Sequence, residues 1–225
     1  PTLYERLTQR VPVSYIDSNW LLECCVNQNK FHTIKLKRLI DIIASFLVII
    51  LILPFALLIV VLIKFDSKGS AFFFQERLGK DGKPFMMIKF RTMDVNVKIK
   101  GAETFASEDY YRITRVGYFL RKFRIDELPQ FINVLRGDMS LIGPRPERRV
   151  FVRDFQKKIA FYKLRLSVRP GISGWAQVNY RYATTTEEHK TKLEYDLFYI
   201  KNMSFLLDLV ILFKSVWVVV FAKGL

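Results

Sequence analysis

Two adjacent carboxylates, Asp126 and Glu127, are the residues of this sequence with the clearest potential for chemistry. Six arginines lie near them in the sequence: Arg121, Arg124, Arg136, Arg145, Arg148 and Arg149. An opposite charge within a few ångströms lowers a carboxyl pKa by about 1–3 units, so we expect both acids to stay ionised. Such a site suits an anionic substrate and a deprotonated nucleophile.

The same residues also have a purely structural interpretation. Asp126 fits the N-cap of a helix, Glu127 fits its first turn, and Pro129 falls where a helix start tolerates proline. Gly137 would end this helix in a left-handed cap, after an apolar face formed by Leu128, Phe131, Ile132 and Leu135. The two interpretations are compatible, because a helix N-terminus also binds phosphate.

Other basic side chains could neutralise a phosphoryl group. Lys89 and Arg91 flank Phe90 at the end of an expected strand, which would put them on one face. Arg145 lies between two prolines, and the resulting stiff loop suits a phosphate clamp. The bland alternatives, a solvated strand edge and a surface turn, explain the same patterns equally well.

Composition indicates a membrane partner. The chain has 225 residues, a formal charge of +15 and 51% hydrophobic residues, including 20 Phe. Such a large positive net charge implies a polyanionic partner, but the apolar content argues against a plain nucleic-acid-binding module. Cys24 and Cys25 are neighbours, so no disulfide framework is expected and a reduced, cytoplasmic setting fits. The chain opens with Pro1, so we expect a fragment of a longer protein.

The apolar run over residues 42–63 carries no charge and meets the criterion of about 20 residues for a membrane-spanning helix. Pro54 interrupts it, and basic residues flank both ends, which pulls both ends to the cytoplasm. Two arms of about 18 Å cannot each cross a hydrocarbon core of about 30 Å, but they can enter and return. We therefore expect a re-entrant helical hairpin over residues 35–66, in preference to a full span or a buried core helix.

The remaining sequence predicts a small mixed domain over residues 67–225, after a leader or the tail of a preceding domain over residues 1–34. Residues 72–79 and 84–91 should form a β-hairpin through Asp81 and Gly82. Residues 150–166 read as a basic amphipathic helix lying on a membrane or exposing a solvated face. Helices are expected over residues 187–201 and 204–222, the last packed on the domain or in the membrane interface. The expected fold class is an α-rich α+β fold.

Five motifs in order resemble one known family, the bacterial monotopic phosphoglycosyltransferases. They are residues 37–41 (Lys-Arg-Leu-Ile-Asp), 89–93 (Lys-Phe-Arg-Thr-Met), 126–130 (Asp-Glu-Leu-Pro-Gln), 137–146 and 169–179. The match is to the catalytic part of the undecaprenyl-phosphate hexose-1-phosphate transferases and covers about residues 35–225. Leu53 stands where members of this family have a serine before the proline of the membrane helix.

The resemblance implies a function and a site. Asp126 would be the nucleophile, and Asp126 and Glu127 would hold Mg²⁺. The reaction would transfer hexose-1-phosphate from a UDP-hexose to undecaprenyl phosphate at the cytoplasmic face of the bacterial inner membrane, with release of UMP. It would serve exopolysaccharide, O-antigen or capsule synthesis. Candidates for phosphate binding are Lys89, Arg91, Arg121, Arg145 and Arg169, and Pro54 would mark the membrane break. No nucleic-acid partner is expected, and a homodimer is left open.

Two other functions compete with this one. A membrane-tethered polyanion binder would explain the charge and the apolar run, without turnover. A metal-dependent glycosyltransferase of the nucleotide-binding α/β type would release UDP, but the sequence has no Asp-x-Asp signature, and Glu194-x-Asp196 is a weak substitute. Neither a Walker loop nor a Gly-x-Gly-x-x-Gly motif is present.

Overall fold

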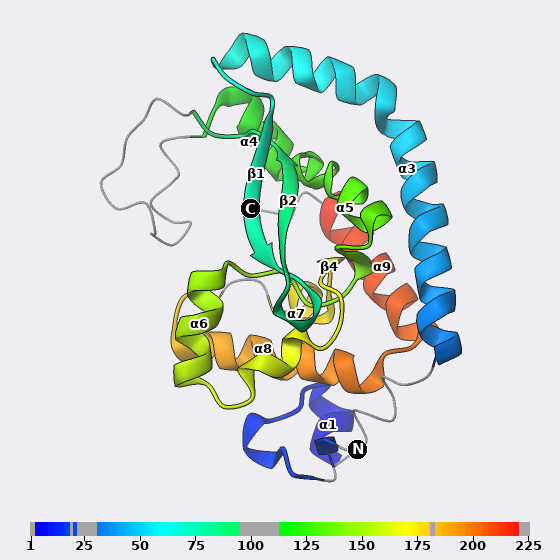
Figure 1. Cartoon of the computed structure of the whole chain (residues 1–225), viewed down its shortest axis with the longest axis vertical. Helices are drawn as coiled ribbons and strands as arrows, with labels where there is room; N and C mark the ends of the chain where they lie inside the picture. The colour runs from blue at the N-terminus through cyan, green and yellow to red at the C-terminus, as the bar shows by residue number, and fades with distance from the viewer. Residues whose placement is uncertain (1–2, 19, 22–30, 95–112, 181–182, 221–225) are drawn as a thin grey trace.

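The computed structural model describes residues 3–18, 20–21, 31–94, 113–180 and 183–220. Its largest element is α3, Phe31–Asp66, which runs along one side of the molecule and then turns across one end (Figure 1). Pro54 lies inside this helix. Proline removes one backbone hydrogen bond and is the usual cause of a sharp bend. The segment is one bent helix, and its re-entry into a membrane as a hairpin stays a prediction.

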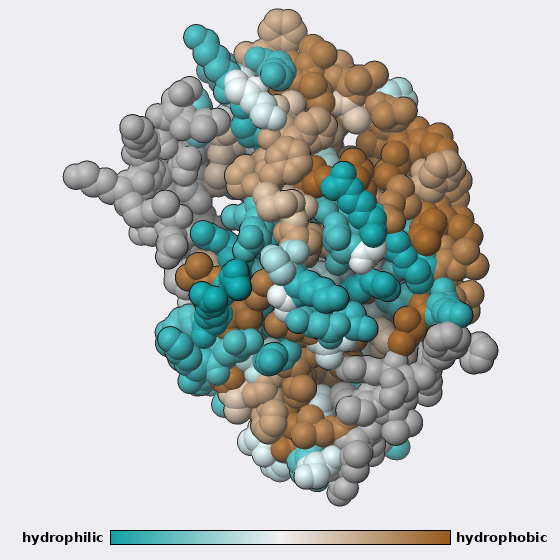
Figure 2. Space-filling view, viewed as in Figure 1, coloured by the Kyte–Doolittle hydropathy of each residue, from teal (hydrophilic) through white to brown (hydrophobic). Residues whose placement is uncertain are grey.

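Among the described residues, α3 is the one helix long and apolar enough to cross a membrane, over Ile34–Asp66, with 6% of its most apolar window buried. In Figure 2 the hydrophobic residues gather over α3, whereas hydrophilic residues cover the middle of the same face. Its polar N-terminal turns dock on the domain. Lys37 Nζ lies 2.6 Å from Asp208 Oδ2, and Asp41 Oδ1 accepts a hydrogen bond from Leu141 N at 3.1 Å.

The predicted β-hairpin is confirmed. Strands β1, Phe72–Leu78, and β2, Pro84–Phe90, pair antiparallel, with Phe72 opposite Phe90. The turn at Lys80–Gly82 places Asp81 at φ 57° and Gly82 at φ 74°. Asp and Gly tolerate this left-handed region best, which is why their pair signalled a hairpin in the sequence.

The acidic pair lies between two helices, α4, Arg115–Lys122, and α5, Gln130–Arg136. Asp126 is not the N-cap of a helix; both acids lie in a 3-10 turn, Ile125–Glu127. The turn is closed by bonds from Glu127 N to Arg124 O and from Leu128 N to Ile125 O. Because Pro129 has no N–H to continue this pattern, α5 begins only after it. Gly137 ends α5 at φ 90°, as predicted.

The larger hydrophobic core is formed mainly by the C-terminal half. It contains α6, Arg149–Lys158; a 3-10 turn, Tyr162–Leu166; α7, Trp175–Asn179; α8, Thr186–Asn202; α9, Phe205–Val220; and the parallel pair β3, Ser140–Ile142, with β4, Gly171–Ser173. The single amphipathic helix over residues 150–166 was wrong, because α6 ends at Lys158 and Phe161 has φ 59°. Val152 and Phe155 of α6 are buried in this core. The apolar face of α6 therefore packs against protein.

The expected C-terminal helices are confirmed, and α9 packs on the domain. Its Ile211 is fully buried, and its Lys214 lies 4.5 Å from the ring centroid of Trp175. The N-terminal segment is also part of the domain, with α1, Leu3–Thr8, and a 3-10 turn, Val13–Tyr15. Val11 N donates to Glu194 O in α8 at 3.1 Å, and Lys201 of α8 pairs with Glu5 at 3.1 Å.

Candidate active site

Three cations from three segments converge on one oxygen of Glu127. Arg145 Nη2 lies 2.7 Å from Glu127 Oε1, Lys89 Nζ of β2 lies 2.9 Å away, and Arg124 Nη1 lies 3.8 Å away. Asp126 and Glu127 are both buried, with exposed fractions of 8% and 7%. The structure therefore brings together four of the residues expected from the sequence, and adds Arg124.

The two neighbouring carboxyls have opposite pKa shifts. Burial disfavours the charged form of Glu127, but the charges of Arg145 and Lys89 and the hydrogen bond from Arg145 hold its pKa well below the usual value. Burial and the charge of Glu127 raise the pKa of Asp126, against the charges of Lys89 and Arg121. The expectation that both pKa values fall was correct for Glu127 and wrong for Asp126. Within the described residues Asp126 makes no hydrogen bond or ion pair, because the nearby cations are directed at Glu127.

Arg121 approaches the pair from α4. Its Nε donates to Thr92 Oγ1 at 2.9 Å, and its charge favours the ionised form of Asp126. A Cβ on Gly117 would lie 2.2 Å from Thr92 O, so only glycine lets α4 approach this segment so closely. Thr92 and Gly117 thus determine the position of the helix turn that carries Arg121.

Arg91 and Arg169 lie apart from this cluster. Arg91 is buried and donates from Nη2 to Ser67 O at 2.7 Å and from Nη1 to Lys68 O at 3.0 Å, just past the end of α3. Arg91 follows the last residue of β2, and its side chain binds the chain just after α3. It therefore does not share a site with Lys89. Arg169 Nε donates to Gly137 O at 3.0 Å, at the opposite end of α5 from the acids.

Asn133 is a site-building residue that sequence reasoning missed. It is fully buried on α5, accepts from Ile88 N at 3.0 Å and donates to Met86 O at 2.8 Å. Its amide thus pairs with β2 as a neighbouring strand would, and holds α5 beside the strand that carries Lys89. A single polar residue among Phe131, Ile132, Val134 and Leu135 was the signal that could have found it.

The acidic pair fits the modest demands of Mg²⁺. No group of three or more His, Cys, Asp or Glu side chains that could hold a metal occurs among the described residues. Mg²⁺ is commonly bound by one or two carboxylates with substrate phosphates and water completing its shell. Asp126 and Glu127 Oε2 make no hydrogen bond or ion pair within the described part of the chain, so these oxygens are available for such a role.

The fold combines one long apolar helix with a small mixed domain, and comparison identifies the family. The chain belongs to the bacterial sugar transferase family, whose profile matches residues 32–222. A UDP-N-acetylgalactosamine-undecaprenyl-phosphate N-acetylgalactosaminephosphotransferase of Aeromonas hydrophila is 47% identical over 94% of this chain and 49% of its own length. A UDP-glucose:undecaprenyl-phosphate glucose-1-phosphate transferase of Escherichia coli K12 is 44% identical over 81% of this chain and 39% of its own.

The chain thus spans half or less of the length of these two relatives. An uncharacterised sugar transferase of Bacillus subtilis is closer in extent, with 40% identity over 84% of this chain and 90% of its own length.

Proposed function

We propose that this protein transfers a sugar-1-phosphate from a UDP-sugar to undecaprenyl phosphate. The observation that carries the proposal is the pairing of one carboxylate saturated with cations, Glu127, with an adjacent carboxylate, Asp126, that makes no hydrogen bond or ion pair to the described residues. Two relatives that align with 94% and 81% of this chain bear names with a UDP-sugar donor and the same lipid acceptor.

In the proposed first step an Asp126 oxygen attacks the sugar-bearing phosphorus of the UDP-sugar. The bond between this phosphorus and the bridging oxygen of the diphosphate breaks, and UMP leaves with the bridging oxygen. The sugar phosphate remains on the enzyme as an acyl phosphate. In the second step a phosphate oxygen of undecaprenyl phosphate attacks the same phosphorus and frees the carboxylate. Dividing one difficult transfer into two easier ones is the advantage of covalent catalysis.

The surrounding cations have a defined part in this scheme. Phosphoryl transfer spreads negative charge over the phosphate oxygens, and fixed positive groups stabilise that charge. Lys89 and Arg145 are held by Glu127, and Arg121 is held by Thr92, so none of them must reorganise to meet the substrate. A bound Mg²⁺ would supply further neutralisation of the diphosphate, with Asp126 and Glu127 as its protein ligands.

The proposed membrane position rests on α3. Its apolar surface and basic ends support a helix that enters the cytoplasmic leaflet of the inner membrane and returns at its bend, which would put the acids where a soluble nucleotide sugar meets a lipid phosphate. An apolar cavity of about 80 Å³ between α3, β3 and α9, lined among others by Leu36, Ile40 and Leu209, would receive part of the polyprenyl chain.

The test is product analysis with purified protein, UDP-sugars and undecaprenyl phosphate. Wild type should release UMP and form lipid-linked sugar phosphate, and Asp126→Asn should do neither. Asp154→Asn, at an exposed acid of α6 paired with Lys158, is the matched control and should retain full activity. Normal turnover by Asp126→Asn would refute the mechanism, release of UDP would indicate a glycosyltransferase, and salt-sensitive lipid binding without turnover would indicate a polyanion binder.

A further inference from the structure

The loop that presents Arg145 is held by an unusual set of bonds. Four consecutive backbone carbonyls each accept from a different donor: Pro144 O from Gly171 N at 3.0 Å, Arg145 O from Arg165 Nη2 at 3.0 Å, Pro146 O from Arg77 Nη1 at 3.2 Å and Glu147 O from Leu78 N at 3.1 Å. The donors come from β1, β4 and the 3-10 turn before β4. Because each peptide is tied separately, the loop cannot rotate at one residue without losing a hydrogen bond.

Arg165 is the buried side chain behind this loop. It is 4% exposed, and its Nη2 lies 2.9 Å from Asp196 Oδ2 in α8. Its Nη1 donates to Tyr162 Oη at 2.8 Å and lies 3.7 Å from Glu147 Oε1. The cavity in front of it has a volume of only about 10 Å³, about that of one water molecule, so it is no substrate pocket.

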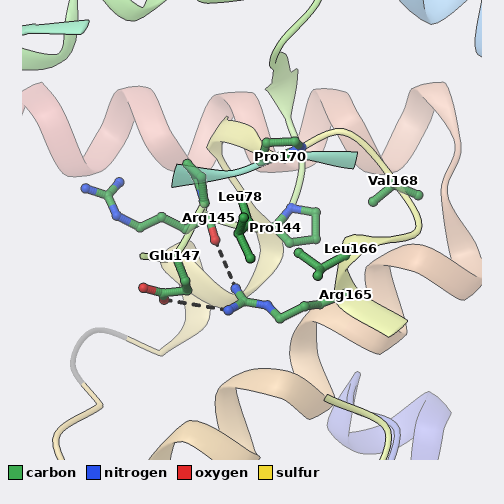
Figure 3. A pocket seen from close by; sticks show the side chains of 10 residues that line it. Leu78, Pro144, Arg145, Glu147, Arg165, Leu166, Val168 and Pro170 are labelled. Atoms are coloured by element: carbon green, nitrogen blue, oxygen red, sulfur yellow. Dashed lines mark hydrogen bonds and ion pairs between the residues drawn. The ribbon is translucent and has the colours of Figure 1, made fainter. Parts of the chain in front are cut away.

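Figure 3 shows the consequence for Arg145. Its carbonyl faces Arg165, and its guanidinium points away from the cavity. That guanidinium donates to Glu127 Oε1 at 2.7 Å. The chain of contacts therefore runs from Asp196 through Arg165 to the backbone of Arg145, and from the side chain of Arg145 to the acidic pair.

We propose that Arg165 is a positioning residue: by binding the Arg145 carbonyl, it holds the Arg145 guanidinium on Glu127 and in place for the substrate diphosphate. This inference rests on the proposed function and extends it to a residue that touches neither carboxylate. Burying an ion pair as deep as that of Arg165 and Asp196 is a poor way to gain stability, since apolar groups of the same volume do as well or better. A geometric role explains why a guanidinium is present, because its Nη1 binds Tyr162 Oη while its Nη2 binds the Arg145 carbonyl beside Asp196, all from one rigid plane.

The experiment is a double-mutant cycle on nucleotide release. Arg165→Lys keeps the charge opposite Asp196 but loses the rigid fork. In the wild-type background it should lower kcat/KM about 10- to 100-fold, because misplacing a reacting group by about 1 Å can cost about 100-fold. In an Arg145→Met background it should change kcat/KM less than about twofold, since the group it positions is gone. An equal loss in both backgrounds would overturn the proposal.

A matched control separates positioning from stability. Lys201→Met breaks another buried pair, that of Lys201 and Glu5, far from the loop in the fold. It should lower Tm, and any loss of activity should be the same in both Arg145 backgrounds.

A second cycle does not depend on turnover. If Arg165 delivers Arg145 to Glu127, the falls in Tm caused by Arg165→Lys and Arg145→Met should be clearly less than additive, because Arg165→Lys would already weaken the Arg145–Glu127 contact that Arg145→Met removes. Additive falls in Tm would contradict the inference even if the protein released no nucleotide. Absence of nucleotide release with non-additive Tm changes would instead count against the proposed function alone.

Discussion

At the scale of residues, two carboxyls adjacent in the chain have different environments. Glu127 is the centre of a cation cluster, whereas the pKa of Asp126 is raised by burial and by Glu127 itself. Environments that push two pKa values apart are typical of sites where two acids have different tasks. We therefore propose that Glu127 is the anion that holds the cations and that Asp126 supplies the reacting oxygen.

Glu147 gives a stability prediction at the same scale. Burial opposes its charge, but the charges of Lys192 and Arg165 and the hydrogen bond from Lys192 lower the pKa of Glu147 from 4.5 to about 2. A carboxyl with a lowered folded pKa stabilises the fold above its unfolded pKa, and that contribution is lost as the pH falls through the folded value. Glu147→Gln should therefore lower Tm at pH 7, with a difference from wild type that shrinks between pH 4.5 and about 2. A difference independent of pH would contradict this account, and Glu76→Gln, at an exposed position of β1, is the control.

At the scale of elements, the site depends on how α5 docks on β2. Asn133→Leu should destabilise the protein by about 2 kcal/mol, because it leaves the buried Ile88 N without a partner and removes the hydrogen bond to Met86 O. It should also reduce nucleotide release, since Lys89 follows Ile88 on the same strand. Asn202→Leu, which removes one side-chain hydrogen bond within α8, is the control for losing a half-buried asparagine. Unchanged stability of Asn133→Leu in chemical unfolding would refute the docking role.

The contact between α3 and α9 yields a prediction about the lipid. Leu209 lines the cavity between these helices, and Leu209→Trp should fill it. The variant should raise the KM for a long polyprenyl phosphate severalfold, while the rate of UMP release in the first half-reaction stays unchanged. Leu206→Trp, at a position of α9 that is 72% exposed, should leave both quantities unchanged. An unaltered acceptor KM in Leu209→Trp would exclude the cavity as a lipid site.

At the scale of the whole molecule, the sequence predicted what depends on neighbours in the chain. Asp81 and Gly82 predicted the hairpin turn, Gly137 predicted a helix end, and the apolar run predicted the long helix α3 that contains Pro54. These features rest on local backbone preferences and on hydrophobic periodicity, and both can be recognised from a short segment of the sequence.

What could not be predicted is which of many arginines meets the acids. Arg91 and Lys89 are two residues apart, yet one fastens α3 and the other pairs with Glu127. Arg165 was one basic residue among several in an expected surface helix, and only the folded chain buries it beside Asp196. Such assignments depend on contacts between distant segments. A one-residue change in where a strand or helix ends redirects a long side chain completely.

The measurement that tests the central claim most directly is mass spectrometry of the protein incubated with a UDP-sugar in the absence of lipid acceptor. The account predicts an added sugar-phosphate mass on the peptide that contains Asp126, lost on addition of undecaprenyl phosphate and missing in Asp126→Asn. Lipid-linked sugar phosphate that accumulates without this adduct, or an adduct on another residue, would contradict it.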